Sequence, residues 1–358
     1  MPTLTPSPPA LLAGRFRLDH KIGSGGMATV WSATDLKIGR VVAVKLMSLA
    51  LATDLRLRRR FLAEAVSLAK IVSPHVVSVH DFDFAGPAPF LAMERLDGQD
   101  LGQLCRANRR LGVRDALDIV RQAGAGLLAA HRAGVIHRDV KLSNIFVCDT
   151  AIEAPLVKLL DFGVAKTVGE TSSVTAIDTF VGSLAYSSPE HVRCEPASPS
   201  FDLWGLAVVA FRLLTGVAPF RGSLCDVLRA IALADYPSPT SIASDLPRAC
   251  EDFFAKALAK EQKDRFQTIG ELVDALERAL LLASGSHARP LDPRWCEALA
   301  EAEGVSAEGC ASLYDTFVDE PTSHSSQTMH VGPAWARLQS ATPQSPAAQN
   351  PSSKERMS

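Results

Sequence analysis

Two short polar runs about twenty residues apart constrain this chain more than any other feature of its sequence. The first is His137-Arg138-Asp139-Val140-Lys141-Leu142-Ser143-Asn144, and the second is Asp161-Phe162-Gly163. The first run supplies an aspartate, a lysine two residues later and an asparagine five residues later. The second supplies another aspartate at a tight turn. Either run alone is a weak signal, but the two together in this order are specific.

Phosphoryl transfer from Mg-ATP requires this combination of side chains. A carboxylate, here Asp139, orients the attacking hydroxyl and accepts its proton. The amide oxygen of Asn144 and the carboxylate of Asp161 hold Mg²⁺. The ammonium of Lys141 offsets charge on the moving phosphoryl group. The runs therefore predict Asp139, Lys141 and Asn144 as catalytic residues, with Asn144 and Asp161 as metal ligands.

Length and composition narrow the class of protein. A chain of 358 residues exceeds the roughly 250–300 residues that one core usually serves, which favours a two-lobed unit with a tail, or two domains. Hydrophobic residues make up 47% and charged residues 21%, and the net charge of −2 does not suggest a nucleic-acid or membrane binder. The seven cysteines form no C-x-x-C pair, so we expect reduced thiols rather than disulfides or a zinc site.

No segment has the composition of a membrane span or a targeting signal. The proline-rich start, 1–13, lacks a basic region followed by a long apolar one. The longest apolar stretch, Leu203–Phe211, is far shorter than the roughly 18–20 residues of a transmembrane helix. We expect a soluble, cytoplasmic protein with no membrane partner.

The hydrophobic pattern predicts strands first and helices second. Alternation of apolar and polar residues predicts strands around 16–18, 29–33, 41–45, 76–84 and 90–95, and helical periodicity predicts a helix over 54–71. Further helices are expected over 113–133, 203–215, 224–234, 247–258 and 269–282. This order is typical of an α+β protein with a small antiparallel-sheet lobe and a larger helical lobe.

Both ends of the chain differ in composition from this core. We expect residues 1–14 to be a disordered leader. Residues 284–358 are expected to be a mostly disordered tail rich in serine and proline, within which 292–314 could form a short helix.

A glycine run, Gly23-Ser24-Gly25-Gly26, lies between two predicted strands. Glycines let the backbone approach phosphates closely, but a plain hairpin turn explains the run alone equally well. Lys45, twenty-two residues after Gly23, favours nucleotide binding. A lysine in an apolar strand is often a surface residue, but a buried ammonium needs a partner, and Glu64 on the next helix can supply one.

Together these motifs resemble the eukaryotic-like (Hanks-type) serine/threonine protein kinases of bacteria. The resemblance covers 15–283, with an N-lobe over 15–96 and a C-lobe over 97–283. It rests, in the family's order, on the glycine run, Val42-Ala43-Val44-Lys45, Glu64, His137–Asn144, Asp161-Phe162-Gly163, Ser188-Pro189-Glu190, Asp202 and Arg265.

The resemblance implies an ATP site between the lobes. The residues that it assigns to cofactor binding are Ile22, Gly23, Ser24, Gly25, Gly26, Val30, Ala43, Lys45, Glu64, Met93, Glu94, Leu96, Phe146 and Asp161. Among them Met93 is the gatekeeper, and Glu94 and Leu96 belong to the hinge that meets adenine. Lys45, fixed by Glu64, holds the α- and β-phosphates. A regulatory spine anchored by Asp202 would stack Leu68, Val79, His137 and Phe162.

The resemblance also implies the reaction. Lys141, two residues after Asp139, is typical of kinases acting on serine and threonine, and Ser183 keeps a hydroxyl that bonds toward both. We expect an active kinase that uses ATP with Mg²⁺ or Mn²⁺ and phosphorylates proteins, including itself through self-association. A pseudokinase scaffold is a rival, although Lys45, Asp139 and Asp161 are all retained. A small-molecule phosphotransferase is a second rival, which the Pro-Glu segment argues against.

Several basic residues are expected to control activity or to stabilise the fold. Arg138, directly before Asp139, is associated in this family with phosphorylation of the activation segment, where Thr175 and Thr179 are the candidates. Both could instead be ordinary polar loop residues. A cluster of four arginines lies at the start of the helix predicted over 54–71: Arg56, Arg58, Arg59 and Arg60. These side chains either bind such a phosphorylated loop or belong to a solvated helix end. Glu190 and Arg265 should form a buried ion pair in the helical lobe.

Overall fold

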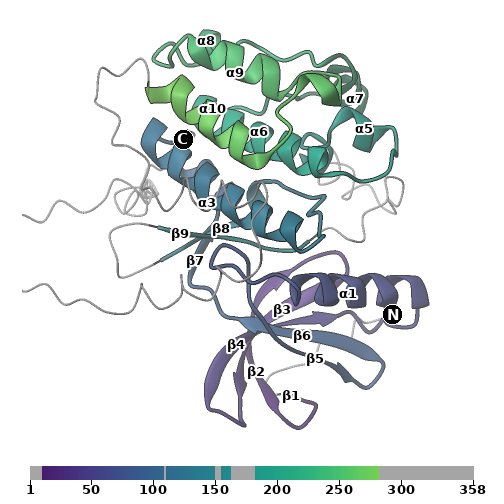
Figure 1. Cartoon of the computed structure of the whole chain (residues 1–358). Helices are drawn as coiled ribbons and strands as arrows, with labels where there is room; N and C mark the ends of the chain where they lie inside the picture. The colour runs from purple at the N-terminus through teal and green to yellow at the C-terminus, as the bar shows by residue number, and fades with distance from the viewer. Residues whose placement is uncertain (1–9, 109, 150–154, 163–181, 282–358) are drawn as a thin grey trace, which may run out of the picture.

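A computed structural model describes residues 10–108, 110–149, 155–162 and 182–281 (Figure 1). A six-stranded sheet with one long helix makes up the first lobe, and helices dominate the second. The predicted α+β class with segregated lobes is confirmed. The predicted tail, 284–358, and its helix over 292–314 lie outside the described residues.

The first lobe is an antiparallel sheet with the strand order β1-β2-β3-β4-β6-β5. All five predicted strands are present, together with one that was not predicted. The strands are β1 (Leu11–Leu12), β2 (Phe16–Ser24), β3 (Ala28–Asp35), β4 (Arg40–Met47), β5 (Val79–Ala85) and β6 (Ala88–Glu94).

Two boundaries differ from the sequence-based expectation. The leader predicted to be disordered over 1–14 is wrong at its end, because β1 pairs with β2 and Leu12 is buried in the core of the sheet lobe. Strand β5 begins at Val79 rather than at residue 76, because Val76 instead bridges to Leu159.

Helix α1 (Leu55–Leu68) packs against β5 and β6. The Asp54 side chain caps it by accepting hydrogen bonds from backbone N–H groups of its first turn. Phe61 and Leu68 lie on its buried face, and so does the carboxylate of Glu64. The helix therefore carries a charged side chain toward the interior, which requires a partner there.

A small second sheet with the order β7-β8-β9 brings the two polar runs together. Its strands are β7 (Gly98–Asp100), β8 (Ile145–Cys148) and β9 (Leu156–Leu159). The first polar run leads through a 3₁₀ turn into β8, and β9 ends two residues before Asp161. Because β8 and β9 are antiparallel neighbours, the two runs meet at one end of this pair.

The second lobe contains the five helices predicted for it, each within a few residues of its expected bounds. Helix α6 starts one turn earlier than expected, at Pro199, because proline suits the first turn of a helix. The helices are α2 (Leu101–Asn108), α3 (Val113–Arg132), α5 (Pro189–Val192), α6 (Pro199–Thr215), α7 (Leu224–Leu233), α8 (Pro239–Ile242), α9 (Ala249–Ala257) and α10 (Ile269–Leu281). Among the described helices none is long and apolar enough to cross a membrane.

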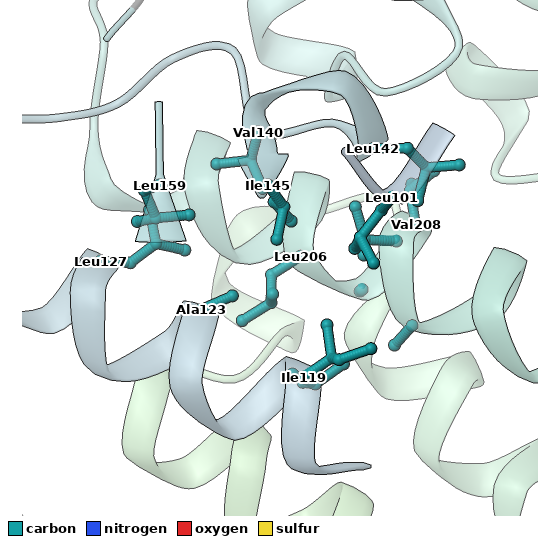
Figure 2. Close-up of a cluster of buried hydrophobic side chains, with 14 of the residues drawn as sticks. Leu101, Ile119, Ala123, Leu127, Val140, Leu142, Ile145, Leu159, Leu206 and Val208 are labelled. Carbon is teal, nitrogen blue, oxygen red and sulfur yellow. The ribbon is translucent and has the colours of Figure 1, made fainter. Parts of the chain in front are cut away.

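Figure 2 shows what holds the first polar run in place. Val140 and Leu142 point into a buried cluster formed with side chains of α3, α6, β8 and β9. Side chains alternate along extended backbone, so Asp139 and Lys141 face away from that cluster. The apolar residues of the run anchor it, and its polar residues lie on the opposite side.

Candidate active site

Lys45 joins the sheet lobe to the second polar run. Its Nζ lies 2.7 Å from Oε1 of Glu64 on α1 and 2.7 Å from Oδ1 of Asp161. The Lys45 and Glu64 side chains are 13% and 11% exposed, whereas that of Asp161 is 55% exposed. Desolvation lowers the pKa of Lys45, but the two carboxylates outweigh it and raise that pKa above its usual value. The pair predicted between Lys45 and Glu64 is present, and the ammonium is charged.

The carboxylate of Asp139 is surrounded by donors. Lys141 Nζ lies 2.9 Å from its Oδ2, and Asn144 Nδ2 donates to the same oxygen at 2.8 Å. The Ser183 hydroxyl donates to its Oδ1 at 3.4 Å and accepts from Lys141 Nζ at 2.9 Å. The residues predicted to be catalytic therefore converge on one carboxylate.

The donor set also fits a divalent cation. Asn144 directs its amide nitrogen to Asp139, which leaves its carbonyl oxygen as the acceptor. Asp161 bonds Lys45 through Oδ1, and its side chain is 55% exposed, so a ligand can reach its carboxylate. Carboxylate and amide oxygens suit Mg²⁺ or Mn²⁺ better than zinc.

The glycine run forms the tip of the β2–β3 hairpin and does not open a helix. Gly23 lies opposite Val30, and the Gly25 N–H donates to the Ala28 carbonyl at 2.8 Å. A side chain added at Gly26 would meet nothing within 4 Å. The tip is thus open, and its backbone can be approached closely by a ligand.

Most of the other predicted ATP-binding residues lie in the sheet that carries Lys45 or directly after it. Ala43 on β4 pairs with Met93 on β6, and both are buried. Leu96 follows β6, while Phe146 belongs to β8 in the small sheet, and both are partly buried. Ile22, on β2, is 44% exposed.

Comparisons with known proteins agree with this geometry. The family model described as "Protein kinase domain" matches residues 16–275. The chain belongs to the protein kinase family. Serine/threonine-protein kinase PknA of Mycobacterium tuberculosis is 34% identical over 278 residues, and PknE of Mycobacterium bovis is 35% identical over 275 residues. These matches cover 76% and 77% of this chain, which places the kinase in the bacterial serine/threonine branch.

The solved structures support the fold. The crystal structure of the Mycobacterium tuberculosis PknI kinase domain is matched with a TM-score of 0.61 and 26% identity, over 77% of this chain and all of that one. The matched regions span 63% of PknA and 48% of PknE, so this kinase covers only part of the length of those relatives. Family membership implies the use of ATP, a divalent metal and protein substrates.

Asp202, in the first turn of α6, holds the backbone of the kinase's first polar run. Its Oδ2 accepts from the His137 N–H at 2.9 Å, and its Oδ1 accepts from the Arg138 N–H at 2.8 Å. His131 on α3 places Nε2 2.7 Å from the same carboxylate. His131 was not predicted from the sequence, although an imidazole on the inward face of an apolar helix is a usable signal.

Three residues of the predicted spine belong to or pack against one buried cluster, and the fourth, His137, contacts Phe162. The rings of His137 and Phe162 are 4.4 Å apart, and Leu68 belongs to the same buried cluster as Phe162. Val79 packs against that cluster from β5. The stack predicted from the resemblance is consistent with this packing.

A second charged cluster lies deep in the helical lobe. Arg265 uses both terminal nitrogens to bind the two carboxylate oxygens of Glu190, at 2.7 and 2.9 Å. Its remaining donors reach the Ser200 hydroxyl and the carbonyls of Ala259 and Lys260. The predicted buried ion pair is therefore present, with side chains 1% and 0% exposed.

The hinge residue Glu94 has a partner that the sequence analysis missed. Its Oε1 accepts from Lys158 Nζ on β9 at 2.8 Å and from the Ser78 N–H at 2.7 Å. The Glu94 side chain thus connects the hinge to both sheets. A lysine within a short apolar strand, Leu156–Leu159, was the available signal.

Two predicted phosphosites, Thr175 and Thr179, lie outside the described residues. Arg138, their expected partner, has positive φ, and its Nε is buried with no hydrogen-bond partner within the described part of the chain. Arg58 lies over the ring of Phe84, and Arg56 is 81% exposed, as expected of a solvated helix end.

Proposed function

We propose that this chain is an active protein kinase that transfers the γ-phosphoryl group of ATP to serine and threonine hydroxyls of proteins. One observation carries the proposal. The carboxylate of Asp139 is held by Lys141, Asn144 and Ser183, while Lys45 is held separately by Glu64 and Asp161. A base and a phosphate-binding cation are thus both positioned before any substrate arrives.

Each group has a role that its contacts support. Asp139 accepts the proton of the incoming hydroxyl, and Lys141 neutralises charge on the phosphoryl group during transfer. Asn144 and Asp161 would hold Mg²⁺ or Mn²⁺, which supplies charge neutralisation at the phosphates when bound. Lys45 would bind the α- and β-phosphates.

The adenosine end of ATP would lie under the sheet lobe. The glycine tip, from Gly23 to Gly26, would cover the phosphates with Ile22 beside it. Val30 and Ala43 would contact one face of adenine, and Phe146 the other. Met93 would close the pocket, with Glu94 and Leu96 at its edge.

The test is a transfer assay with the full chain. Purified protein, γ-labelled ATP, Mg²⁺ and a generic basic protein should give label on serine and threonine. EDTA should abolish labelling, and added Mg²⁺ or Mn²⁺ should restore it. Asp139→Asn protein, purified identically, controls for a contaminating kinase.

Three outcomes would contradict the proposal. No transfer to any protein would favour a pseudokinase scaffold. ATP consumption that depends on a small hydroxylated or amino compound, without protein labelling, would favour a small-molecule phosphotransferase. Full activity after thorough chelation would rule out the roles of Asn144 and Asp161 in binding metal.

Autophosphorylation of the activation segment is the regulatory part of the proposal. A phosphate on Thr175 or Thr179 would bring a partner to the guanidinium of Arg138, whose Nε has none among the described residues. Mass spectrometry after incubation with ATP should find phosphate at one of these sites, and Thr175→Ala/Thr179→Ala should lower activity. Unmodified threonines, or a fully active double variant, would leave transfer intact but rule out this switch.

A further inference from the structure

A pocket of about 820 Å³ lies on the molecule away from the residues proposed to bind ATP and substrate. It is formed by the end of α1, the loop from α1 to β5, and β9. Its walls are mostly apolar, with Ile71, Val72 and Leu156 among them, and the Val72 side chain is 78% exposed at its rim. An apolar pocket of this size with an exposed apolar rim is a typical binding surface.

The lining of this pocket contains no acidic side chain, and an exposed cation lies at its edge. The lining includes the cation Lys158, and Lys70 beside it is exposed. The ammonium of Lys158 is already paired with Glu94 in the hinge, so Lys70 is the exposed cation that a ligand would meet. A ligand with apolar side chains and carboxylates would match both the walls and the charge.

The described chain ends close to this pocket. Gln122 of α3 hydrogen-bonds the backbone on both sides of Leu156, a pocket residue. The preceding residue, Arg121, bonds Glu277 of α10, four residues before the last described residue, Leu281. Figure 1 shows the end of α10 and the start of β9 on the same side of the molecule. The tail therefore begins one helix away from the pocket.

One segment of the tail has the required chemistry. Leu313-Tyr314-Asp315-Thr316-Phe317-Val318-Asp319-Glu320 combines four large apolar or aromatic side chains with three carboxylates. Thirty-one residues separate it from Leu281. A random-coil chain of thirty-one residues spans roughly 30 Å on average, and tethering over such a distance gives a local concentration on the order of millimolar.

We propose that residues 313–320 dock in this pocket of the same chain, with their apolar side chains against Ile71, Val72 and Leu156 and their carboxylates toward Lys70. The docked segment would cover the exposed apolar rim. It would also lie close to Lys158, whose ammonium binds Glu94 in the hinge. The proposal does not depend on catalytic activity.

Disulfide trapping in the full chain tests this placement. Cys310 lies three residues before the segment, and Val72→Cys places a thiol at the pocket rim; Cys194 and Cys225, both exposed, are replaced by serine. Oxidised glutathione takes up the two electrons and two protons of the thiols, so that one protein disulfide forms and two glutathione thiols are released. Peptide mapping should find the 72–310 bond, independent of protein concentration. Leu233→Cys, 56% exposed on α7, is the matched control and should give about tenfold less.

A second variant separates docking from tail proximity. Tyr314→Ser/Phe317→Ser should reduce the 72–310 yield to that of the control and increase hydrogen exchange in residues 68–79. Equal yields at 72 and 233, or exchange unchanged by the double substitution, would overturn the proposal. A bond to Cys296 instead would assign the pocket to another segment, and disulfide dimers that increase with protein concentration would assign it to a second copy.

Discussion

The kinase contains two clusters in which a basic side chain is paired with carboxylates. The two clusters differ in how far water can reach them. In the cleft, Lys45 is divided between Glu64 and Asp161, and the latter side chain is 55% exposed. In the helical lobe, Arg265 binds Glu190 with both side chains essentially unexposed. The first cluster is open on one side, and the second is closed.

The two clusters also differ in whether their polar atoms are all occupied or can take a new partner. All five N–H donors of Arg265 can be assigned to Glu190, Ser200 and two backbone carbonyls. The open cluster keeps acceptor oxygen on the solvent side. A closed network fixes the arrangement of helices, whereas an open one can exchange an internal partner for a ligand. Substitutions should therefore impair activity in one cluster and stability in the other.

The largest expected effect concerns the open site. Asp139→Asn keeps the shape of the side chain but removes the carboxylate that accepts the hydroxyl proton. Transfer should fall by about 10²–10⁴-fold, while the melting temperature changes little. Steady-state assays and thermal denaturation measure both. Asp252→Asn, exposed on α9, should alter neither. More than about a tenth of wild-type activity in Asp139→Asn would contradict the assignment of the base.

Substitution in the closed cluster should lower stability and leave activity nearly unchanged. Arg265→Ala leaves the carboxylate of Glu190 buried without its cation, so unfolding should become easier by about 3–5 kcal/mol. Urea denaturation measures the loss. Activity per folded molecule should be retained at low temperature, because Arg265 contacts no residue of the cleft cluster in the described part of the chain.

The exposed pair of Arg110 and Asp245 supplies a matched control. Their side chains are 33% and 63% exposed, so Arg110→Ala should cost no more than about 1 kcal/mol. An equal loss of stability from Arg110→Ala and Arg265→Ala would show that burial does not distinguish the two kinds of pair.

Much of this comparison could be predicted from the sequence. Long periodic segments, such as those that became α3 and α10, fix their own secondary structure because their apolar faces repeat over several turns. The polar runs identify chemistry because few functions need those side chains at those spacings. The pair of Glu190 and Arg265 came from the family pattern, and the structure shows it closed.

What could not be predicted depends on tertiary contacts. Strands β7, β8 and β9 have three or four residues each, too few for alternation to be distinguished from loop sequence. The bonds from His131 to Asp202 and from Lys158 to Glu94 join residues 71 and 64 positions apart. Only the packed lobes bring such residues together.

A third prediction concerns α6, the helix that contacts both the closed cluster and the first polar run. On α6, Ser200 bonds Arg265, Asp202 holds the first polar run, and Gly205 faces Val140. A β-carbon at Gly205 would lie 2.9 Å from the Val140 side chain and carbonyl. Gly205→Ala should therefore displace the run that carries the base and lower the free energy of unfolding by about 1–3 kcal/mol.

Kinetic measurements on this variant distinguish a displaced Asp139 from a general loss of stability. In Gly205→Ala the turnover number should fall about tenfold, with a smaller change in KM for ATP, because Lys45 and Glu64 lie on the other lobe. A fall in stability without a fall in turnover number per folded molecule would show that Val140 adjusts without moving Asp139.

The smallest expected effect is the response of the closed cluster to acid. Burial raises the pKa of Glu190, but the hydrogen bonds and charge of Arg265 outweigh it and hold that pKa below its usual value. The folded state therefore binds fewer protons than the unfolded state near the ordinary glutamate pKa of about 4.3, so stability rises with pH there. This contribution is present above that pH and is lost as the pH falls through the lower folded-state pKa. Urea denaturation between pH 3 and 6 should show a shallower pH slope for Glu190→Gln than for wild type, although the variant is less stable at pH 7. The slope difference should persist in high salt, because the pair is shielded from solvent ions. Parallel curves for the two proteins would mean that the carboxylate titrates as it does in water, and the cluster would then not be closed.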